Sequence, residues 1–251
     1  IFEVSRSSLY YKSKKYEEDL KVKEKIEKVW SDFPSYGHKR LATALLLNKK
    51  RILRVMKRFN LKPYRRHRKP FKRSGTKELN VYPNLLPITI LVKINQILVT
   101  DFTYLWYKNR FIYVATVIDI WNREVVGVCV LTNHSSALVV QALVSALMDH
   151  PKPDIVHSDQ GGEYTAKIFQ DFCISSGIKI SMSEKGSPWQ NGYQESFYDK
   201  FKIDLGDPNR FDTLGELVYE IYRTIYIYNT TRIHTSLKMS PREFALKNQL
   251  R

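Results

Sequence analysis

The sequence predicts an α/β protein in which a mixed five-stranded sheet flanked by helices follows a small all-α module. Three observations support this prediction. Apolar residues recur with helical spacing in the first third of the chain. Beyond it, short runs of Val, Ile and aromatic residues alternate with amphipathic segments, as in a sheet covered by helices. Charge divides the chain in the same way, because residues 1–80 hold 24 Lys and Arg against 8 Asp and Glu, whereas residues 81–251 hold 17 of each.

Residues 1–61 are expected to form a basic helical module. Helices are predicted over Glu17–Phe33, His38–Leu47 and Lys49–Asn60, the last of them after Asn48, a residue type that caps helices. Two short helices with a tight joint and a basic second helix are typical of a helix-turn-helix that enters the major groove of DNA. The alternative is an ordinary helical hairpin with a solvated basic face. On the first interpretation the DNA-binding residues are Arg40, Lys50, Arg51, Arg54, Lys57 and Arg58.

A basic linker is predicted over residues 62–90. Seven of the twelve residues from Lys62 to Arg73 are Lys or Arg, and the two prolines in this run prevent a regular helix. Such a segment would lie along a phosphate backbone or in a minor groove. A disordered tether is the alternative, and the two interpretations are compatible. The linker residues expected to contact DNA are Arg65, Arg66, Arg68 and Lys69.

Residues 91–251 are expected to form the sheet and its helices. The first three strands are joined by short turns around Asn109 and Asn122, so they should form an antiparallel meander. The predicted strands are Gln96–Tyr104, Phe111–Ile120, Glu124–Leu131, Asp154–His157 and Lys179–Met182. The predicted helices are Ser135–Met148, Ala166–Ser175, one within Ser187–Leu205, and Leu214–Asn229. The order βββαβαβα is that of the ribonuclease H-like fold.

Three acidic residues are expected to meet in this domain. Asp101 lies on the first predicted strand, Asp159 just past the fourth, and Glu195 on a later helix, with 35 residues between Asp159 and Glu195. The two strands are neighbours in the ribonuclease H-like topology. Carboxylates packed together repel one another unless cations bind between them. Mg²⁺ prefers oxygen ligands, and two such ions about 4 Å apart would activate an attacking oxygen and stabilise a leaving one.

Each carboxylate also has an ordinary explanation. An Asp at a strand end is usually a turn former, and a Glu on a helix is usually solvated. Asp119 also follows a strong strand and is assigned no catalytic role. Order, spacing and the glycine turn at residues 160–162 distinguish the three carboxylates from such cases.

Six motifs in the chain form one specific string. They are Y-G-H-K-R-L at Tyr36–Leu41, T-D-F-T-Y at Thr100–Tyr104, V-I-D at Val117–Asp119, H-S-D-Q-G-G-E-Y at His157–Tyr164, S-P-W-Q-N-G-Y-Q-E-S-F at Ser187–Phe197, and Y-N-x-x-R-x-H-x-S-L at Tyr228–Leu237. With them the chain resembles the integrase-core transposases of bacterial insertion sequences, in particular the downstream-frame product of the IS-three family. This group is related to the catalytic cores of retroviral integrases.

The resemblance implies an activity and the residues that carry it. Asp101, Asp159 and Glu195 would be the catalytic metal ligands, holding two Mg²⁺ ions for which Mn²⁺ would substitute. Lys202 would contact DNA near the site, and Arg232 and His234 would contact or position a DNA end. The implied reaction is transposition, in which nicking frees a 3′-hydroxyl at each element end and that hydroxyl then attacks a phosphodiester.

The resemblance also implies the partners. They are double-stranded DNA, as element ends and as target, and further copies of the chain, because two ends must be brought together in a homodimer or a larger assembly. An upstream-frame segment with a helix-turn-helix and a leucine zipper is a further expected partner.

Two other functions remain open from the sequence. A nuclease of the same fold would cut without joining, although the basic first third argues against it. A DNA-binding protein without chemistry is the other, although the intact triad argues against that. The chain lacks an apolar run of about 18 residues, which predicts no membrane span. Two cysteines 44 positions apart suit a reducing compartment, so a cytoplasmic, nucleoid-associated protein is expected.

Overall fold

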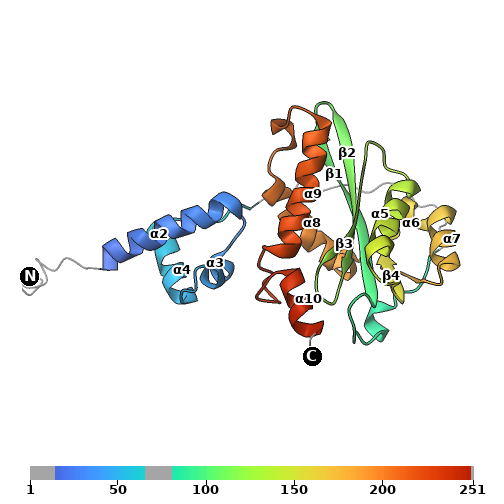
Figure 1. Ribbon diagram of the computed structural model, residues 1–251, viewed down its shortest axis with the longest axis horizontal. Coiled ribbons are helices and arrows are strands. Elements are labelled where there is room, and N and C mark those ends of the chain that lie inside the picture. Colours follow the sequence, from blue (N-terminus) through green and yellow to red (C-terminus); the bar gives the residue numbers. More distant parts are fainter. Residues whose placement is uncertain (1–14, 66–80, 250–251) are drawn as a thin grey trace, which may run out of the picture. The chain divides into compact units, whose positions relative to one another are not determined.

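The computed structural model describes residues 15–65 and 81–249 (Figure 1). The chain divides into two compact units, residues 1–65 and 66–251. The division falls inside the predicted 62–90 linker. Of the linker residues expected to contact DNA, Arg65 is described, whereas Arg66, Arg68 and Lys69 lie outside the described residues.

Three helices make up the described part of the first unit: α2 (Lys15–Asp32), α3 (His38–Ala44) and α4 (Lys49–Arg58). They confirm the predicted all-α region, with ends that differ from the prediction by up to three residues. The Asn48 side chain accepts a hydrogen bond from the Lys50 backbone N–H at 2.8 Å, which caps α4. Apolar side chains from all three helices form the core of the first unit, namely Val22, Ile26, Leu41, Ile52 and Val55.

Ion pairs join α2 to α4 beside this core. The Asp19 carboxylate is fully buried and accepts hydrogen bonds from Arg54 at 2.7 Å and Arg58 at 3.0 Å. One turn away, Arg51 pairs with Glu18 at 3.2 Å. The basic side chains of α4 therefore stabilise the packing of the first unit.

The second unit is built on a five-stranded sheet. Its strands are β1 (Ile97–Tyr107), β2 (Arg110–Asp119), β3 (Val125–Leu131), β4 (Ile155–Ser158) and β5 (Lys179–Met182), in the spatial order β3-β2-β1-β4-β5. The first three strands pair antiparallel, and β4 pairs parallel with both β1 and β5. This is the mixed sheet that the sequence predicts.

The β1–β2 hairpin is longer than predicted. A two-residue turn, Lys108–Asn109, joins the strands, and both residues have positive φ values of 40° and 68°. Such turns match the right-handed twist of a hairpin, and Asn tolerates the left-handed conformation well. Pairing therefore continues to Tyr107 and Arg110 at the tip.

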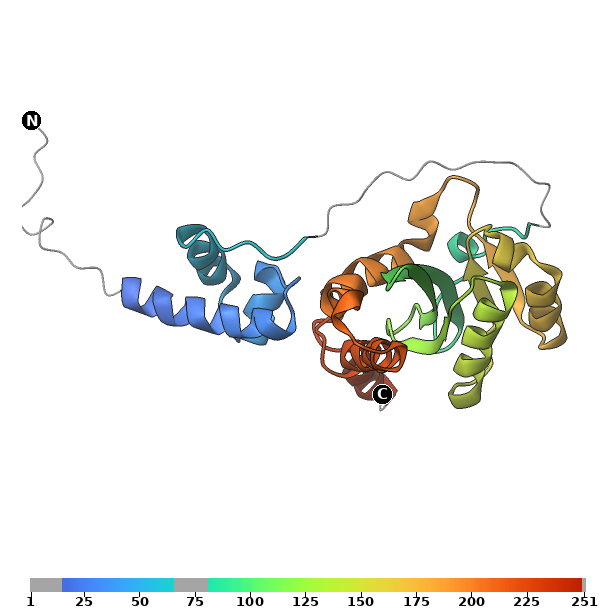
Figure 2. The same cartoon turned by 90° about the horizontal axis from the view of Figure 1, so that it is seen from above.

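Helices cover both faces of the sheet, as Figures 1 and 2 show. On one face α8 (Gly192–Leu205) and α9 (Leu214–Thr230) pack on Ile97, Val99 and Val114. On the other, α5 (Ser136–Asp149) and α7 (Lys167–Ser175) pack on Leu98, Ala115 and Val117. Because strand residues alternate between faces, β1 to β4 contribute to both cores, whereas β5 contributes Ile180 and Met182 to the second.

One glycine sets the spacing of α5 from the sheet. A Cβ at Gly127 on β3 would lie 2.3 Å from the Ala142 carbonyl oxygen and 2.8 Å from the Ala146 Cβ, so only glycine permits this close approach. The remaining elements are α6 (Gly162–Thr165), α10 (Pro241–Gln249) and the 3₁₀ turns Leu86–Ile88, Pro188–Asn191 and Pro208–Arg210. Across the described ranges, every helix is too short or too polar to cross a bilayer.

Candidate active site

Asp101 and Asp159 are brought together by the pairing of β1 with β4. The register pairs Ile97 with Ile155 and Val99 with His157. Continued by two residues, it sets Asp101 level with Asp159, which follows the last residue of β4. Since Asp101 is two residues beyond Val99, its side chain shares the sheet face that α8 covers.

Glu195 lies in the first turn of α8, and its side chain is exposed. Two buried polar side chains on the inner face of the same helix fix its position. The Gln194 amide donates hydrogen bonds to the Val99 carbonyl oxygen at 2.7 Å and to the Thr116 carbonyl oxygen at 3.1 Å. The Tyr198 hydroxyl donates to the carbonyl oxygen of Asp101 itself at 2.7 Å. Helix α8 is thus held to the backbone beside the first carboxylate.

Thr116 on β2 completes this buried group. Its Oγ1 lies 2.9 Å from Gln194 Oε1 and 2.8 Å from the Tyr198 hydroxyl. Burial, followed by the nearby charge of Asp101, raises the pKa of Tyr198 well above its usual value, so the hydroxyl keeps its proton. We refer to Thr116, Gln194 and Tyr198 as the polar lock of α8.

Several negative charges surround Asp101. Burial raises the pKa of Asp101 well above its ordinary value, and the charge of Asp159 raises it further. Glu195 and Glu163 act in the same direction, against the hydrogen bond that the Phe102 N–H donates to Asp101 Oδ1 at 2.8 Å. The charges of Asp159, Glu195 and Glu163 thus all act on Asp101, and Glu163 is a fourth carboxylate beside the three predicted from the sequence.

Glu163, the fourth carboxylate, was missed by the sequence reasoning although it belongs to the H-S-D-Q-G-G-E-Y motif. A Cβ at Gly161 would lie 2.9 Å from Asp159 Oδ1 and 3.3 Å from Glu163 Oε2, so glycine lets the turn bring these two carboxylates close. The Gly161 N–H also donates to Asp159 Oδ1 at 2.8 Å. On its far side Glu163 contacts His134, whose Nδ1 lies 2.8 Å from Glu163 Oε1.

The donor set consists of carboxylate oxygens, which are the ligands that Mg²⁺ prefers. Within residues 15–65 and 81–249, no three Asp, Glu, His or Cys side chains form a closed metal-binding group. The residues present thus fit a hard divalent cation by their chemistry, while their side chains do not converge on one point.

His157, two residues before Asp159, has a structural place. It is fully buried, and its Nδ1 lies 2.8 Å from Ser181 Oγ on the neighbouring strand β5. Burial lowers the pKa of His157 to about 4, so the imidazole is neutral at physiological pH. It supports the strand end that carries Asp159.

The second unit places the residues expected to contact DNA in different settings. Lys202 lies on α8 with its Nζ 5.2 Å from the centre of the Tyr104 ring. Arg232 is almost fully buried, and its Nε lies 2.5 Å from Asp204 Oδ2 near the end of α8. The His234 backbone N–H donates to the Met239 carbonyl oxygen.

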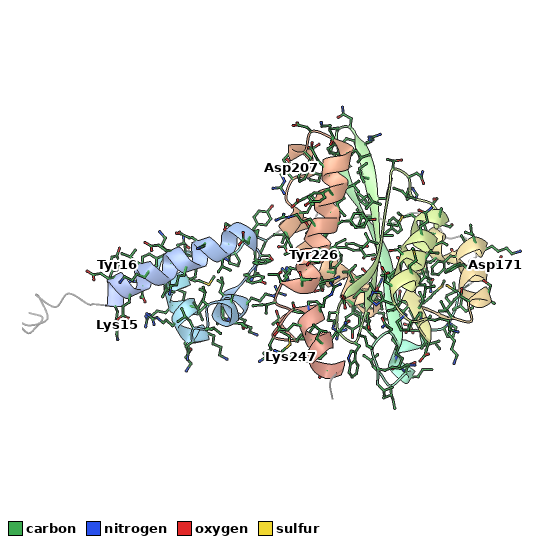
Figure 3. The ribbon with its side chains drawn as sticks, viewed as in Figure 1. Lys15, Tyr16, Asp171, Asp207, Tyr226 and Lys247 are labelled. Carbon is green, nitrogen blue, oxygen red and sulfur yellow. The ribbon has the colours of Figure 1, made fainter. Side chains whose placement is uncertain are left out.

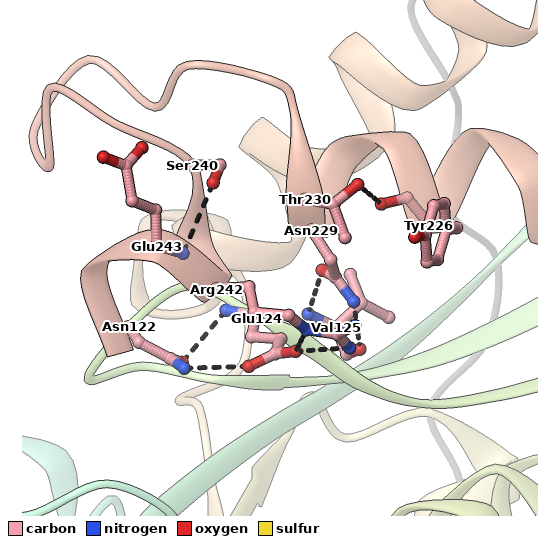
Figure 4. Close-up of polar contacts among 9 residues, drawn as sticks. All are labelled: Asn122, Glu124, Val125, Tyr226, Asn229, Thr230, Ser240, Arg242 and Glu243. Carbon is pink, nitrogen blue, oxygen red and sulfur yellow. Dashed lines mark hydrogen bonds and ion pairs between the residues drawn. The ribbon is translucent and has the colours of Figure 1, made fainter. Parts of the chain in front are cut away.

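The rest of the C-terminal motif also makes internal contacts (Figure 4). Asn229 forms two 2.9 Å hydrogen bonds with the backbone of Val125, one to its N–H and one to its carbonyl oxygen. Glu124 accepts from Arg242 of α10 and from Asn122. These contacts tie α9 and α10 to the start of β3.

The first unit shows a similar contrast. Arg51, Arg54 and Arg58 form the ion pairs with α2, although Arg54 and Arg58 stay exposed, as Lys50 and Lys57 do. The Arg40 guanidinium carbon lies 5.8 Å from the centre of the Tyr36 ring. DNA contact by these residues stays a prediction.

Comparison with known proteins identifies the class to which this fold and site belong. Two family models described as integrase core domain match residues 92–188 and 176–241. The HTLV-2 integrase catalytic core domain, solved in complex with magnesium, superposes with a TM-score of 0.50 at 20% identity, over 60% of this chain and 96% of that one. A simian T-cell lymphotropic virus intasome chain gives a TM-score of 0.55 at 19% identity, over 87% of this chain and 73% of that one. The second unit is therefore a ribonuclease H-like integrase core.

Relatives in sequence narrow the class to one family. The chain is 33% identical to the transposase for insertion sequence element IS904 of Lactococcus lactis, over 90% of this chain and 94% of that protein. It is 30% identical to a putative transposase of element IS150 from Escherichia coli, over 96% of this chain and 90% of that protein. The chain belongs to the family of insertion-sequence transposases with an integrase core.

Proposed function

We propose that this transposase joins DNA strands at Asp101, Asp159 and Glu195, with Mg²⁺ as its divalent cation. The observation that carries the proposal is the β1–β4 register, which sets Asp101 level with Asp159 on the side of the sheet that α8 covers. The negative charges of Asp159, Glu195 and Glu163 raise the pKa of Asp101 further than burial alone, and a bound cation would relieve that repulsion.

The residues of this chain hold the site ready for the cation and the DNA. Backbone N–H groups of Phe102 and Gly161 orient the carboxylates of Asp101 and Asp159. The polar lock keeps Glu195 on the turn of α8 nearest to them, and cation binding would draw its exposed side chain inward. When bound, Mg²⁺ activates the attacking oxygen and stabilises the leaving oxygen of a phosphodiester. Positioning and electrostatics are then the contributions of the protein.

The DNA partners follow from the reaction. We infer that element ends and target DNA bind as duplexes, with Lys202 near the site and the basic residues of the first unit and linker on phosphates. Two ends must react together, so we expect a dimer or a larger assembly on DNA, acting at the nucleoid. Two ions per site, Mn²⁺ substitution and an upstream-frame partner segment belong to the same proposal.

The experiment that tests the proposal compares strand joining by the wild type and by Asp159→Asn. Labelled DNA carrying the element's own ends is incubated with each protein and Mg²⁺. We expect joined products from the wild type, a loss of at least about 1,000-fold in Asp159→Asn, and DNA affinity within about threefold. Asp171→Asn is the matched control, because this exposed carboxylate lies on α7 at the periphery of the unit (Figure 3), and it should join normally.

Other outcomes would contradict the proposal. Joining by Asp159→Asn at the wild-type rate would remove this carboxylate from the site. Nicking by the wild type without joining would indicate a nuclease, and binding with neither reaction would indicate a DNA-binding protein without chemistry.

A further inference from the structure

One face of the β1–β2 hairpin carries an uncovered series of aromatic side chains. Phe102, Tyr104 and Trp106 alternate along β1 on the face opposite the Asp101 side chain. Register places Tyr104 opposite Tyr113 and Trp106 opposite Phe111, on the same face of β2. Figure 1 shows the hairpin extending beyond the end of α5, the helix that covers this face further down. The side chains of Tyr104, Trp106 and Phe111 are therefore 48%, 50% and 42% exposed.

These rings form a continuous track. Ring centres of Trp106 and Phe111 are 4.8 Å apart, those of Tyr104 and Phe111 5.2 Å, and those of Phe111 and Tyr113 6.3 Å. From Tyr113 the track continues to Phe102 at 6.5 Å. We call these five residues the aromatic track.

The track leads to the carboxylate group. The His134 ring stacks on Phe102 with an interplanar angle of 5° and lies 5.1 Å from the Tyr113 ring. His134 in turn contacts Glu163, which lies beside Asp159. One end of the aromatic track is thus linked by direct contacts to the proposed site, and the other end is the hairpin tip.

The edge of β1 is open between these two features. In the described part of the sheet, β4 pairs with β1 only as far as Val99, so the strand beyond it has no neighbour on that side. Lys202 reaches from α8 to this edge, and its Nζ lies over the Tyr104 ring at 5.2 Å. A chain crossing the open edge would pass from the carboxylates to the rings beside this ammonium group.

We propose that the aromatic track binds unpaired bases of a DNA strand that enters or leaves the carboxylate site. The inference rests on the proposed function. Aromatic faces stack on any base, and a cation beside them neutralises the phosphate. Tyr104 and Trp106 lie three and five residues beyond Asp101, about 10 and 17 Å along the strand. A stacked strand rises about 3.4 Å per nucleotide, so this spacing suits about three to five unpaired nucleotides.

A strand of nucleic acid fits this surface better than a second copy of the chain. A symmetric contact between two copies would bring the same patch to both sides and place two Lys202 side chains on one small face. That juxtaposition of like charges opposes association, whereas a phosphate backbone is attracted by them.

Fluorescence and affinity measurements on the full chain test the inference without requiring any reaction. The probes are a blunt duplex and the same duplex with a tail of about four unpaired nucleotides containing 2-aminopurine, in EDTA. For the wild type we expect the tail to tighten binding by about tenfold and its fluorescence to be quenched by stacking. Trp106→Ser should reduce the advantage of the tail below about threefold and leave blunt-duplex affinity unchanged.

Two further variants separate stacking from damage to the fold. Trp106→Phe keeps a flat ring and should restore most of the advantage of the tail. Tyr226→Ser removes an aromatic of similar exposure on α9, which is 60% exposed, and should behave as the wild type.

Three results would overturn the inference. In the first, the wild type binds tailed and blunt DNA with equal affinity. In the second, Trp106→Ser still binds tailed DNA more tightly than blunt DNA, by the same factor as the wild type. In the third, Trp106→Ser abolishes self-association of the chain while its binding to the tail persists. The last would identify the track as a contact between copies. Failure of the proposed function can be distinguished from failure of this inference. If the wild type stacks the tail but joins no strands, the proposed reaction is refuted and base binding by the aromatic track still stands.

Discussion

Asp101 is the residue of the proposed site on which the neighbouring carboxylates act by electrostatic repulsion. Asp101 is partly buried and lies level with Asp159, and the charges of Asp159, Glu195 and Glu163 act on it, so its ionised form is disfavoured in the folded protein. Groups arranged in this way cost stability until a cation or a proton neutralises them. The residue therefore lowers the stability of the metal-free protein at neutral pH.

Asp101→Asn should raise the melting temperature of the metal-free protein. The amide keeps an oxygen to accept from the Phe102 N–H and removes the charge that its neighbours repel. We expect a rise of at least about 2 °C at pH 7, which corresponds to roughly 1 kcal/mol for a chain of this length. Differential scanning calorimetry in EDTA measures it, with Asp171→Asn as an unchanged control. An equal or lower melting temperature would show that repulsion at Asp101 is not a net cost.

Helix α8 is the element on which the proposed site depends most. It carries Glu195 outward, while Gln194 and Tyr198 on its inner face hold the backbone of β1 and β2. The opposite end of the helix is held by the buried pair of Asp204 and Arg232. The helix is thus fixed at both ends by buried polar contacts rather than by apolar packing alone.

Tyr198→Phe should slow strand joining without weakening DNA binding. The change removes the hydrogen bonds that join the Tyr198 hydroxyl to the Asp101 carbonyl oxygen and to Thr116 Oγ1. The turn of α8 that carries Glu195 then becomes less firmly held. Small displacements of a catalytic group cost about 10- to 100-fold in rate. Single-turnover joining should fall by that factor while Kd stays within about twofold. Tyr193→Phe, an exposed ring on the same helix, is the matched control, and an unchanged rate in Tyr198→Phe would remove the positioning role.

The α2–α4 pair of the first unit gives a prediction on pH. Burial tends to raise the pKa of Asp19, but the hydrogen bonds and charges of Arg54 and Arg58 outweigh it and lower that pKa below 3.8. A carboxyl whose folded-state pKa is depressed stabilises the fold above its unfolded pKa and loses that contribution as pH falls through the folded value.

Asp19→Asn should therefore destabilise the protein at pH 7 by about 1 kcal/mol, a small value because both guanidinium groups are partly exposed. The difference from the wild type should begin to shrink as the pH falls below about 4 and should vanish once the pH is below the folded-state pKa of Asp19. Urea titrations followed by circular dichroism at pH 7 and pH 3 measure it. Glu18→Gln, at an exposed pair, should have less than half this effect at pH 7, and a difference for Asp19→Asn that is undiminished at pH 3 would contradict the ion-pair account.

At the scale of the whole molecule, the fold class could be predicted from the sequence, and so could the elements that carry or precede Asp101, Asp159 and Glu195. Strand periodicity is a local signal, and Asp101 and Asp159 sit at strand positions that the topology makes neighbours. Glu163 could also have been predicted as a member of the carboxylate group, since it lies in the H-S-D-Q-G-G-E-Y motif. The contact of His134 with Phe102 could not have been predicted, because only tertiary packing brings the two rings together.

Charged residues on helices were the least predictable. The sequence shows that Arg54, Arg58 and Arg232 are cationic, but it does not reveal that Asp19 and Asp204 lie opposite them in the fold. An arginine that contacts DNA and an arginine that forms an ion pair within the protein have the same sequence pattern around them. Helix α10 was likewise not predicted, and its position is set by contacts between Arg242 and Glu124 that join distant segments.

The uneven charge of the chain predicts the salt dependence of DNA binding. Each phosphate contact contributes about 0.9 to the slope of log K against log salt concentration. Replacing the exposed Lys50 and Lys57 together by Gln should lower the slope by about 2. Lys179→Gln changes an exposed lysine within residues 81–251, which carry no net charge, and should leave the slope unchanged. An equal slope in the double variant would move the contacts to other residues.

The carboxylates come from three separate stretches of the chain: a strand, the turn after another strand, and a helix that starts at Gly192. No two neighbouring elements contain them all, so the proposed site can be completed only when most of the integrase core has been translated. A chain that ends anywhere before Glu195 carries at most two of the three carboxylates.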